Sequence, residues 1–141
     1  MTKSNLKVLG VFLLVLAASQ IYALPAPLLV KANIPFAFSI QNRNLPAGQY
    51  TIERVWSTNT DVLVIRGENH SQSIFVSESA QKLNAPKQTE LVFDKIGSHY
   101  FLREVWTVGE TTGREVPEAK AEKEVKSAGL TPIQVSVLAR G

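Results

Sequence analysis

Large apolar side chains alternate with smaller or polar ones along much of the chain, most clearly in the segment 34–52. Phe36, Phe38 and Ile40 are each separated by one such residue, and the alternation resumes at Tyr50. A period of two places these side chains on one face of a β-strand. The pattern therefore predicts two strands that share an aromatic inner face.

A short turn separates these two strands and reads Leu45-Pro46-Ala47-Gly48. Pro46 presets the backbone angle φ of the first corner, and Gly48 can take a positive φ that residues with a Cβ resist. We expect this strand–turn–strand unit to organise the fold and not to form a site.

A second hairpin is predicted around Gly97-Ser98, which joins the segments 90–96 and 99–108. A two-residue connection that begins with glycine suits a type II′ turn, whose twist matches that of the flanking strands. We therefore expect an antiparallel pair at this place.

The long second strand of this hairpin carries apolar residues of both parities. Tyr100, Leu102 and Trp106 occupy one parity, and Phe101 and Val105 occupy the other. A strand with no purely polar face is typical of the interior of a sheet, so we expect a central position.

Apolar runs bounded by turn residues predict the remaining strands. The segment 61–66 is apolar on both parities, which indicates a strand covered on both faces. The total of about seven or eight short strands, with no long helix between them, predicts a mainly-β fold. It would be an antiparallel sandwich or a small barrel, and the pattern does not choose between these. The other expected strands are 28–32, 36–40, 50–56 and 73–77.

One short helix is expected in the charge-rich segment 114–129, which lacks aromatic residues. Pro117 suits a first helical turn, and Gly129 suits the position just past a helix end. Glu122 and Lys126 form a favourable pair four residues apart. Because the apolar stripe of this helix is thin, we expect it to be loosely held.

The beginning of the chain has the order of a secretory signal peptide. Lys3 and Lys7 form a short positive region, and residues 8–18 form an unbroken apolar run. This run is shorter than the ~20 residues of a spanning helix. We expect cleavage after Ala23, with cleavage after Ser19 as the alternative.

The expected organisation is a signal peptide at 1–23, a β-domain at 24–113, a charged helix at 114–129, and an edge strand or tail at 130–141. The 141 residues suit one domain. The chain contains no cysteine, so disulfides and a lipoprotein anchor are excluded. The fold must therefore rest on buried apolar surface and a hydrogen-bonded sheet.

The formal net charge of +3 comes from 15 Lys and Arg against 12 Asp and Glu. Without the two lysines of the leader, the balance becomes 13 against 12, a net charge of +1. A balance this small does not indicate a nucleic-acid partner or an anionic membrane.

Three features of the chain belong together: Ile34-Pro35-Phe36-Ala37-Phe38, Leu45-Pro46-Ala47-Gly48-Gln49-Tyr50 and the closing Glu/Lys-rich helix. With them the chain resembles a group of small exported bacterial proteins that carry a signal peptide, PFxF, LPAGxY, a β-rich domain and a short charged C-terminal helix. The resemblance covers most of the mature chain and implies this fold and an exported location. The group has no assigned activity, so the resemblance implies no site residues.

Metal, cofactor and nucleophile signatures are sparse. The two histidines, His70 and His99, lie in different turns, and no cysteine accompanies them, so we expect no metal site. Ser71 follows His70 directly, and adjacent turn residues do not form a catalytic pair with an orienting acid. The segment 109–113 lacks the lysine of a phosphate-binding loop, and we expect no cofactor.

Carboxylates offer one catalytic alternative, because paired acids can hydrolyse glycosidic bonds. Glu53, Glu78, Asp94 and Glu104 lie on or beside expected strands. Basic neighbours accompany two of them, which favours cross-strand salt bridges on a solvated face over a catalytic pair.

Aromatic residues offer a binding alternative. Trp56, Trp106 and Tyr100, together with Tyr50, could form the floor of a sugar- or peptide-binding surface if they lay side by side on one face. Packing in the core is the simpler interpretation, and Trp56 is the best candidate for an exposed ring because it ends its strand beside a polar turn.

Three functional hypotheses remain. The first is an exported non-enzymatic β-domain that acts in the periplasm or outside the cell as a binding or structural module. Its partner would be a polymer or protein of the envelope or the cell exterior. We expect no nucleic-acid partner and no stable membrane insertion after the leader is removed. The second is a small carboxylate-dependent hydrolase of such a polymer. The third is a barrel with an apolar ligand in place of packed Phe36, Phe38 and Tyr100. Acids gathered in a cleft would favour the second, and a filled interior with dispersed charges would favour the first.

Overall fold

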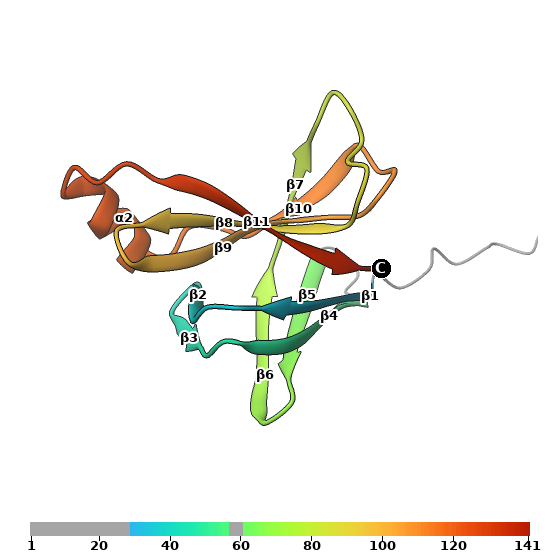
Figure 1. The fold of residues 1–141 in the computed structure, drawn as a ribbon, viewed down its shortest axis with the longest axis horizontal. Helices are drawn as coiled ribbons and strands as arrows, with labels where there is room; N and C mark the ends of the chain where they lie inside the picture. Colours follow the sequence, from blue (N-terminus) through green and yellow to red (C-terminus); the bar gives the residue numbers. More distant parts are fainter. Residues whose placement is uncertain (1–28, 57–60) are drawn as a thin grey trace, which may run out of the picture.

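The structure, a computed structural model, describes residues 29–56 and 61–141 (Figure 1). The predicted signal peptide at 1–23 lies outside the described residues. The described residues form eleven strands and one helix. They are β1 (Leu29–Ile34), β2 (Phe38–Ile40), β3 (Arg43–Leu45), β4 (Gly48–Trp56), β5 (Asp61–Gly67), β6 (His70–Val76), β7 (Glu78–Gln81), β8 (Glu90–Ile96), β9 (His99–Trp106), β10 (Thr112–Glu115), α2 (Lys120–Ser127) and β11 (Ile133–Arg140).

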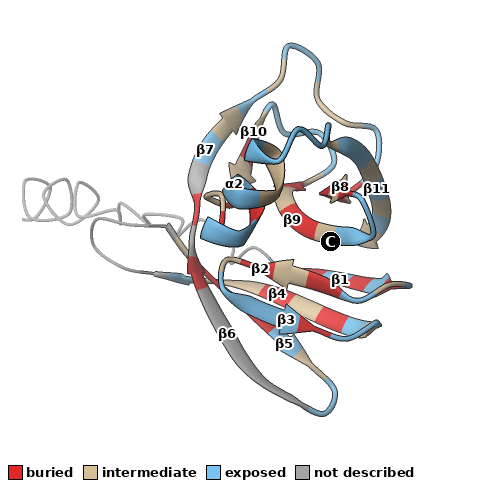
Figure 2. Cartoon of the chain, turned by 90° about the vertical axis from the view of Figure 1, so that its left-hand side faces the viewer, coloured by how far each residue is buried: buried red, intermediate tan, exposed pale blue. Residues whose placement is uncertain are grey.

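One curled sheet contains all of these strands. Its main path runs β3-β2-β9-β8-β11-β1-β4-β5-β6, and β10 pairs with both β7 and β9. The described pairs are antiparallel except β2 with β9, which meet in parallel at Ser39 and Phe101. The sheet curls into a half-barrel, so that β8, β9 and β11 lie over β1 and β4 (Figures 1 and 2). The predicted mainly-β fold with one short C-terminal helix is confirmed.

The core lies between the two halves of the curl (Figure 2). In β1, buried Val30, Ala32 and Ile34 alternate with exposed residues, as a half-buried strand requires. In β5, the consecutive residues Leu63, Val64 and Ile65 are all buried, so the prediction that this strand is covered on both faces is confirmed.

Aromatic rings fill the middle of this core. The Phe36 ring stacks on Tyr100, with ring centroids 3.8 Å apart, and meets Phe93 edge to face at 5.1 Å. Phe38 meets Tyr50 edge to face at 5.1 Å. Such edge-to-face contacts add to the free energy of burying the rings. The predicted aromatic inner face is therefore present, and its rings pack against one another.

The turn before β4 is fixed by a side chain. The Tyr50 hydroxyl donates a hydrogen bond of 2.7 Å to the carbonyl oxygen of Pro46. Gly48, expected to take a turn conformation, has φ +158° and begins β4 in nearly extended backbone. Across the sheet, Gly67 leaves room for the Tyr50 ring, since a Cβ at Gly67 would lie 2.9 Å from a ring carbon.

The hairpin of β8 and β9 has the predicted geometry. Gly97 has φ +61°, whereas Ser98 does not have a positive φ, and this combination is that of a type II′ turn. Ile96 and His99 pair directly across the turn. The central position expected for β9 is also confirmed, because β9 pairs with β8, β2 and β10.

A β-bulge in β9 corrects the predicted faces of that strand. Val92 pairs with Glu104 and Phe93 pairs with Leu102, so Arg103 has no partner residue in β8. The extra residue reverses the alternation beyond it. Leu102 and Val105 therefore belong to the core together, although sequence parity separated them.

The C-terminal segment is an interior strand, where the sequence indicated an edge strand or tail. β11 pairs with β8 on one side and with β1 on the other, and so connects the two halves of the sheet. The structure also adds strands of three or four residues, β3, β7 and β10, which the sequence pattern did not predict.

The helix begins later than expected and is held differently. Pro117 precedes the helix, whose N-cap is Ala119, and Gly129 follows its end with φ +90°. The buried residue of the helix is Glu122, whereas Ala121 is exposed. Contact with the sheet is therefore polar at its centre. Among the residues that the structure describes, no helix has the length and apolar character to cross a membrane.

Candidate functional site

A groove of about 1200 Å³ is the candidate site. Its lining residues come from β1, β4, β5, the end of β11 and the segment 87–89. Its lining includes four basic side chains and one acidic side chain. These are Lys31, Arg66, Lys87, Arg140 and Glu68.

Strand register places most of these charges in one row. Lys31 in β1 pairs with Arg140 in β11 on one side and with Thr51 in β4 on the other. Thr51 in turn pairs with Arg66 in β5. Directly opposite residues of antiparallel strands project from the same face, so the row Arg140–Lys31–Thr51–Arg66 crosses four strands on one surface.

This row lowers the stability of the fold when no ligand is bound. Lys31 and Arg140 are both exposed and directly opposed, and like charges in such pairs destabilise a sheet. Arg66 forms an ion pair with Glu53 at 3.3 Å, with half of the arginine side chain exposed. A surface pair of this kind contributes little stability. The groove therefore keeps a positive surface at the junction of β11 and β1.

Neutral polar and apolar groups complete the lining. Asn33 and Gln49 pair directly across β1 and β4, two residues along the strands from the pair of Lys31 and Thr51. Leu138 and Val108 also line the groove, with 63% and 50% of their surface exposed. Such a mixture of charge, amide and apolar contact is typical of a binding surface.

The predicted aromatic site is dispersed in the structure. Tyr100 is half-buried against the core, and Trp106 lies on the opposite face of β9 with 1% of its surface exposed. The Trp106 ring fits against Gly113, where a Cβ would lie 2.6 Å from it. The side chain of Trp56 lies outside the described part of the chain. The structure does not bring Tyr100 and Trp106 onto one surface, and ligand binding by these three residues stays a prediction.

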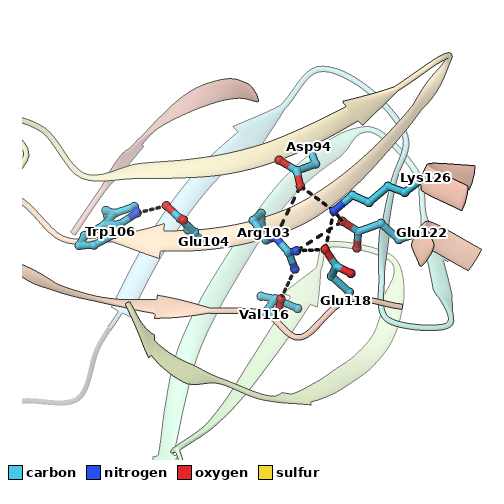
Figure 3. A network of polar contacts seen from close by, with 8 residues as sticks. All are labelled: Asp94, Arg103, Glu104, Trp106, Val116, Glu118, Glu122 and Lys126. Carbon is cyan, nitrogen blue, oxygen red and sulfur yellow. Dashed lines mark hydrogen bonds and ion pairs between the residues drawn. The ribbon is translucent and has the colours of Figure 1, made fainter. Parts of the chain in front are cut away.

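The polar surroundings of Trp106 are specific. Its indole N–H donates a hydrogen bond of 2.5 Å to Glu104 (Figure 3). The Lys82 ammonium lies 4.1 Å from the ring centroid. Lys82 also forms an ion pair with Glu90 at 3.1 Å. Glu104 therefore has a structural partner, because it accepts the hydrogen bond from Trp106.

The other candidate carboxylates and histidines do not converge. Glu53 pairs with Arg66, Asp94 joins the ionic cluster described below, and the side chains of Glu78 and His70 lie outside the described set. His99 is exposed at the tip of the β8–β9 hairpin. Within residues 29–56 and 61–141, no group of three or more acidic or histidine residues is arranged to hold a metal ion.

Five charged residues form an ionic cluster between α2 and the outer face of β8 and β9 (Figure 3). The Arg103 guanidinium lies 2.5 Å from Glu118, 3.7 Å from Glu122 and 3.5 Å from Asp94. The Lys126 ammonium lies 2.5 Å from Glu118, 3.1 Å from Glu122 and 3.5 Å from Asp94. Three carboxylates thus share two cations.

Two members of the cluster, Glu118 and Lys126, have pKa values shifted toward their charged forms. Hydrogen bonding and attraction from Lys126, with a contribution from Arg103, hold the pKa of Glu118 below its usual range. Burial alone lowers the pKa of Lys126, but its hydrogen bonds to Glu118 and Glu122 outweigh that effect and raise this pKa. The predicted Glu122–Lys126 pair is present in this cluster. A carboxyl group with a lowered pKa is a poor proton donor, so Glu118 suits a structural clamp better than general acid catalysis.

Sequence reasoning missed the groove, although it carried a partial signal. Lys31 and Arg140 each occupy an outward position of an alternating strand, which can be read from the sequence, whereas Arg66 ends a strand that is apolar on both parities. Their adjacency depends on which strands pair, and residues 31 and 140 lie at opposite ends of the described chain. The chain matches no protein-family model, no curated protein and no solved structure.

Proposed function

We propose that this chain is an exported, non-enzymatic β-domain that acts in the periplasm or outside the cell as a binding module, through the groove at the β11–β1 junction. The observation that carries the proposal is the row Arg140–Lys31–Thr51–Arg66, in which the like charges of Lys31 and Arg140 face each other across strands. A fold that tolerates this repulsion on a concave surface is typical of one that uses the charges for recognition.

The packed interior argues against an apolar ligand inside the half-barrel. Phe36, Phe38 and Tyr100, which would have to leave space for such a ligand, contact other rings of the core. The groove instead presents four basic side chains beside the apolar Leu138 and Val108. Recognition at this charged groove is therefore the better supported mode.

A carboxylate-dependent hydrolase is the second candidate, because Asp94, Glu118 and Glu122 do gather at one place. Their oxygens, however, face Arg103 and Lys126, and Glu122 is 2% exposed. Water and substrate need access to a catalytic pair of acids. The arrangement supports a clamp for α2 more than a catalytic site.

Export rests on the leader pattern of residues 1–23 and on the resemblance to small exported bacterial proteins. Its test is the mass and N-terminal sequence of the chain recovered from an exporting bacterial host. We expect a chain that begins at Leu24. A full-length chain retained in the cytoplasm would contradict export.

Binding and hydrolysis can be separated in one experiment. The exported full chain is mixed with insoluble cell-envelope material and extracellular polymer, and both depletion of protein and release of soluble fragments are measured. Retention of the protein without fragment release supports a binding module. Lack of retention contradicts the proposal, and fragment release that is lost in Glu118→Gln would support the hydrolase instead.

A further inference from the structure

We propose that the groove binds a linear acidic polysaccharide and that Lys31 and Arg140 contact its carboxylates. The inference rests on the proposed function of the groove as a binding surface and adds the chemical class of the ligand.

The spacing of the row suits a linear chain of anions. Adjacent strands lie about 4.8 Å apart, so three inter-strand steps from Arg140 through Lys31 and Thr51 to Arg66 span roughly 14 Å. Arg140 and Lys31 are thus one inter-strand step apart, and Lys31 and Arg66 are two steps apart with the neutral Thr51 between them. A polymer lying across the strands can place successive carboxylates on this row.

The charge of the lining agrees with such a ligand. Lys87, in the connection before β8, adds a fourth cation beyond the row, and Glu68 is the single acidic lining residue. Among the described residues, no ion pair joins Lys31 or Arg140 to a carboxylate. A carboxylated partner would supply that missing charge and relieve the repulsion between them.

The neutral lining groups favour a sugar over a nucleic acid. Asn33 and Gln49 carry amides that can donate to and accept from sugar hydroxyls. The exposed side chains of Leu138 and Val108 can contact the apolar face of a sugar ring. The aromatic lining residue, Tyr50, is 4% exposed, so it offers no platform on which a base could stack.

The test compares two variants of the exported full chain that lose the same charge. Lys31→Ala/Arg140→Ala removes the central pair of the groove, and Lys120→Ala/Lys123→Ala removes two exposed cations from α2. Binding to soluble polygalacturonate is measured by calorimetry at low salt. Because each exposed ion pair contributes little, we expect the groove variant to bind roughly 3- to 30-fold more weakly and the α2 variant about twofold or less.

Folding is monitored separately in the same variants. Loss of two opposed like charges should leave the unfolding midpoint of the groove variant unchanged or higher. Weaker binding by a variant that is as stable as the wild type therefore reports on recognition. Equal weakening in both double variants would overturn the proposal, because it would indicate attraction that depends on net charge alone.

Further ligands distinguish the source of the anion. Polyphosphate, single-stranded DNA and phosphatidylglycerol vesicles are tested beside polygalacturonate. Tighter binding of any of these with the same dependence on Lys31 and Arg140 would overturn the polysaccharide assignment but leave a binding groove. If excess polygalacturonate does not displace the protein from envelope material, the polysaccharide assignment is also overturned, and the binding groove remains. If the chain binds neither envelope material nor any of these probes, the proposed function fails as well.

Discussion

The Tyr50 hydroxyl donates a 2.7 Å hydrogen bond to the carbonyl oxygen of Pro46, four residues earlier in the chain. The same ring packs edge to face on Phe38 and occupies the space left by Gly67. One side chain thus fixes the turn before β4, the aromatic core and the approach of β5. This relationship gives a physical reason for a tyrosine at position 50, whereas Pro46 contributes only its backbone carbonyl to the bond.

Tyr50→Phe should lower the free energy of unfolding by about 1 kcal/mol, because it removes this hydrogen bond and keeps the ring. The measurement is urea unfolding followed by fluorescence. Tyr100→Phe is the matched control: its ring stacks on Phe36, and no hydrogen bond of its hydroxyl is found among the described residues. Equal losses in the two variants would show that the bond to Pro46 contributes nothing.

Arg103→Met should destabilise the fold by roughly 3–5 kcal/mol, because it leaves three carboxylates with Lys126 as their remaining cation. The Arg103 side chain is 12% exposed, so water cannot replace the lost partner easily. Lys120→Met, which removes an ion pair with Glu124 that is mostly exposed, should cost less than about 1 kcal/mol. Chemical denaturation of both variants measures the difference, and a loss of under about 1 kcal/mol for Arg103→Met would contradict a stabilising cluster.

Acid should weaken the fold through Glu118. The pKa of Glu118 is lower in the folded state than its usual value of 4.5, so folding favours the ionised form. The resulting stabilisation is present above the usual pKa and is lost as the pH falls through the folded pKa. Unfolding free energies measured from about pH 6 to about pH 3 should therefore fall more steeply for the wild type than for Glu118→Gln. Parallel curves would contradict the shifted pKa.

Through Lys126, the stability of the fold should fall as the pH rises in the alkaline range. Its pKa is higher in the folded state than the usual 10.5, since hydrogen bonds to Glu118 and Glu122 outweigh the effect of burial. That stabilisation is present below the usual pKa and is lost as the pH rises through the folded pKa. Lys126→Met should accordingly remove part of the alkaline decline in stability, measured by the same denaturation series.

Lys31→Glu should raise the free energy of unfolding by about 0.2–1 kcal/mol, because it converts an opposed like-charge pair with Arg140 into an attractive one. Thermal unfolding at low and high salt measures the gain, which should shrink as salt screens the pair. Lys87→Glu, in the connection before β8, has no register partner and should change stability little. A gain in stability together with lost binding to an acidic polymer would show that Lys31 is kept for recognition.

The alternation of side chains along each strand was readable because it depends only on neighbouring residues. The inner positions of β1 and the hairpin at Gly97 followed from period and turn chemistry, which are local properties. The bulge at Arg103 was not readable, since one unpaired residue changes no pattern until the partner strand is known. The same limit explains why Leu102 and Val105 were assigned to different faces.

The sequence by itself determined the fold class, the aromatic inner face and the Glu122–Lys126 pair, because each follows from spacing along one element. The tertiary structure alone decided that β11 inserts between β8 and β1. That insertion places Arg140 opposite Lys31, which are separated by almost the whole described chain. Alternation states which way a side chain faces, but the identity of its neighbours depends on strand pairing. The groove and the ionic cluster arise from such long-range pairings.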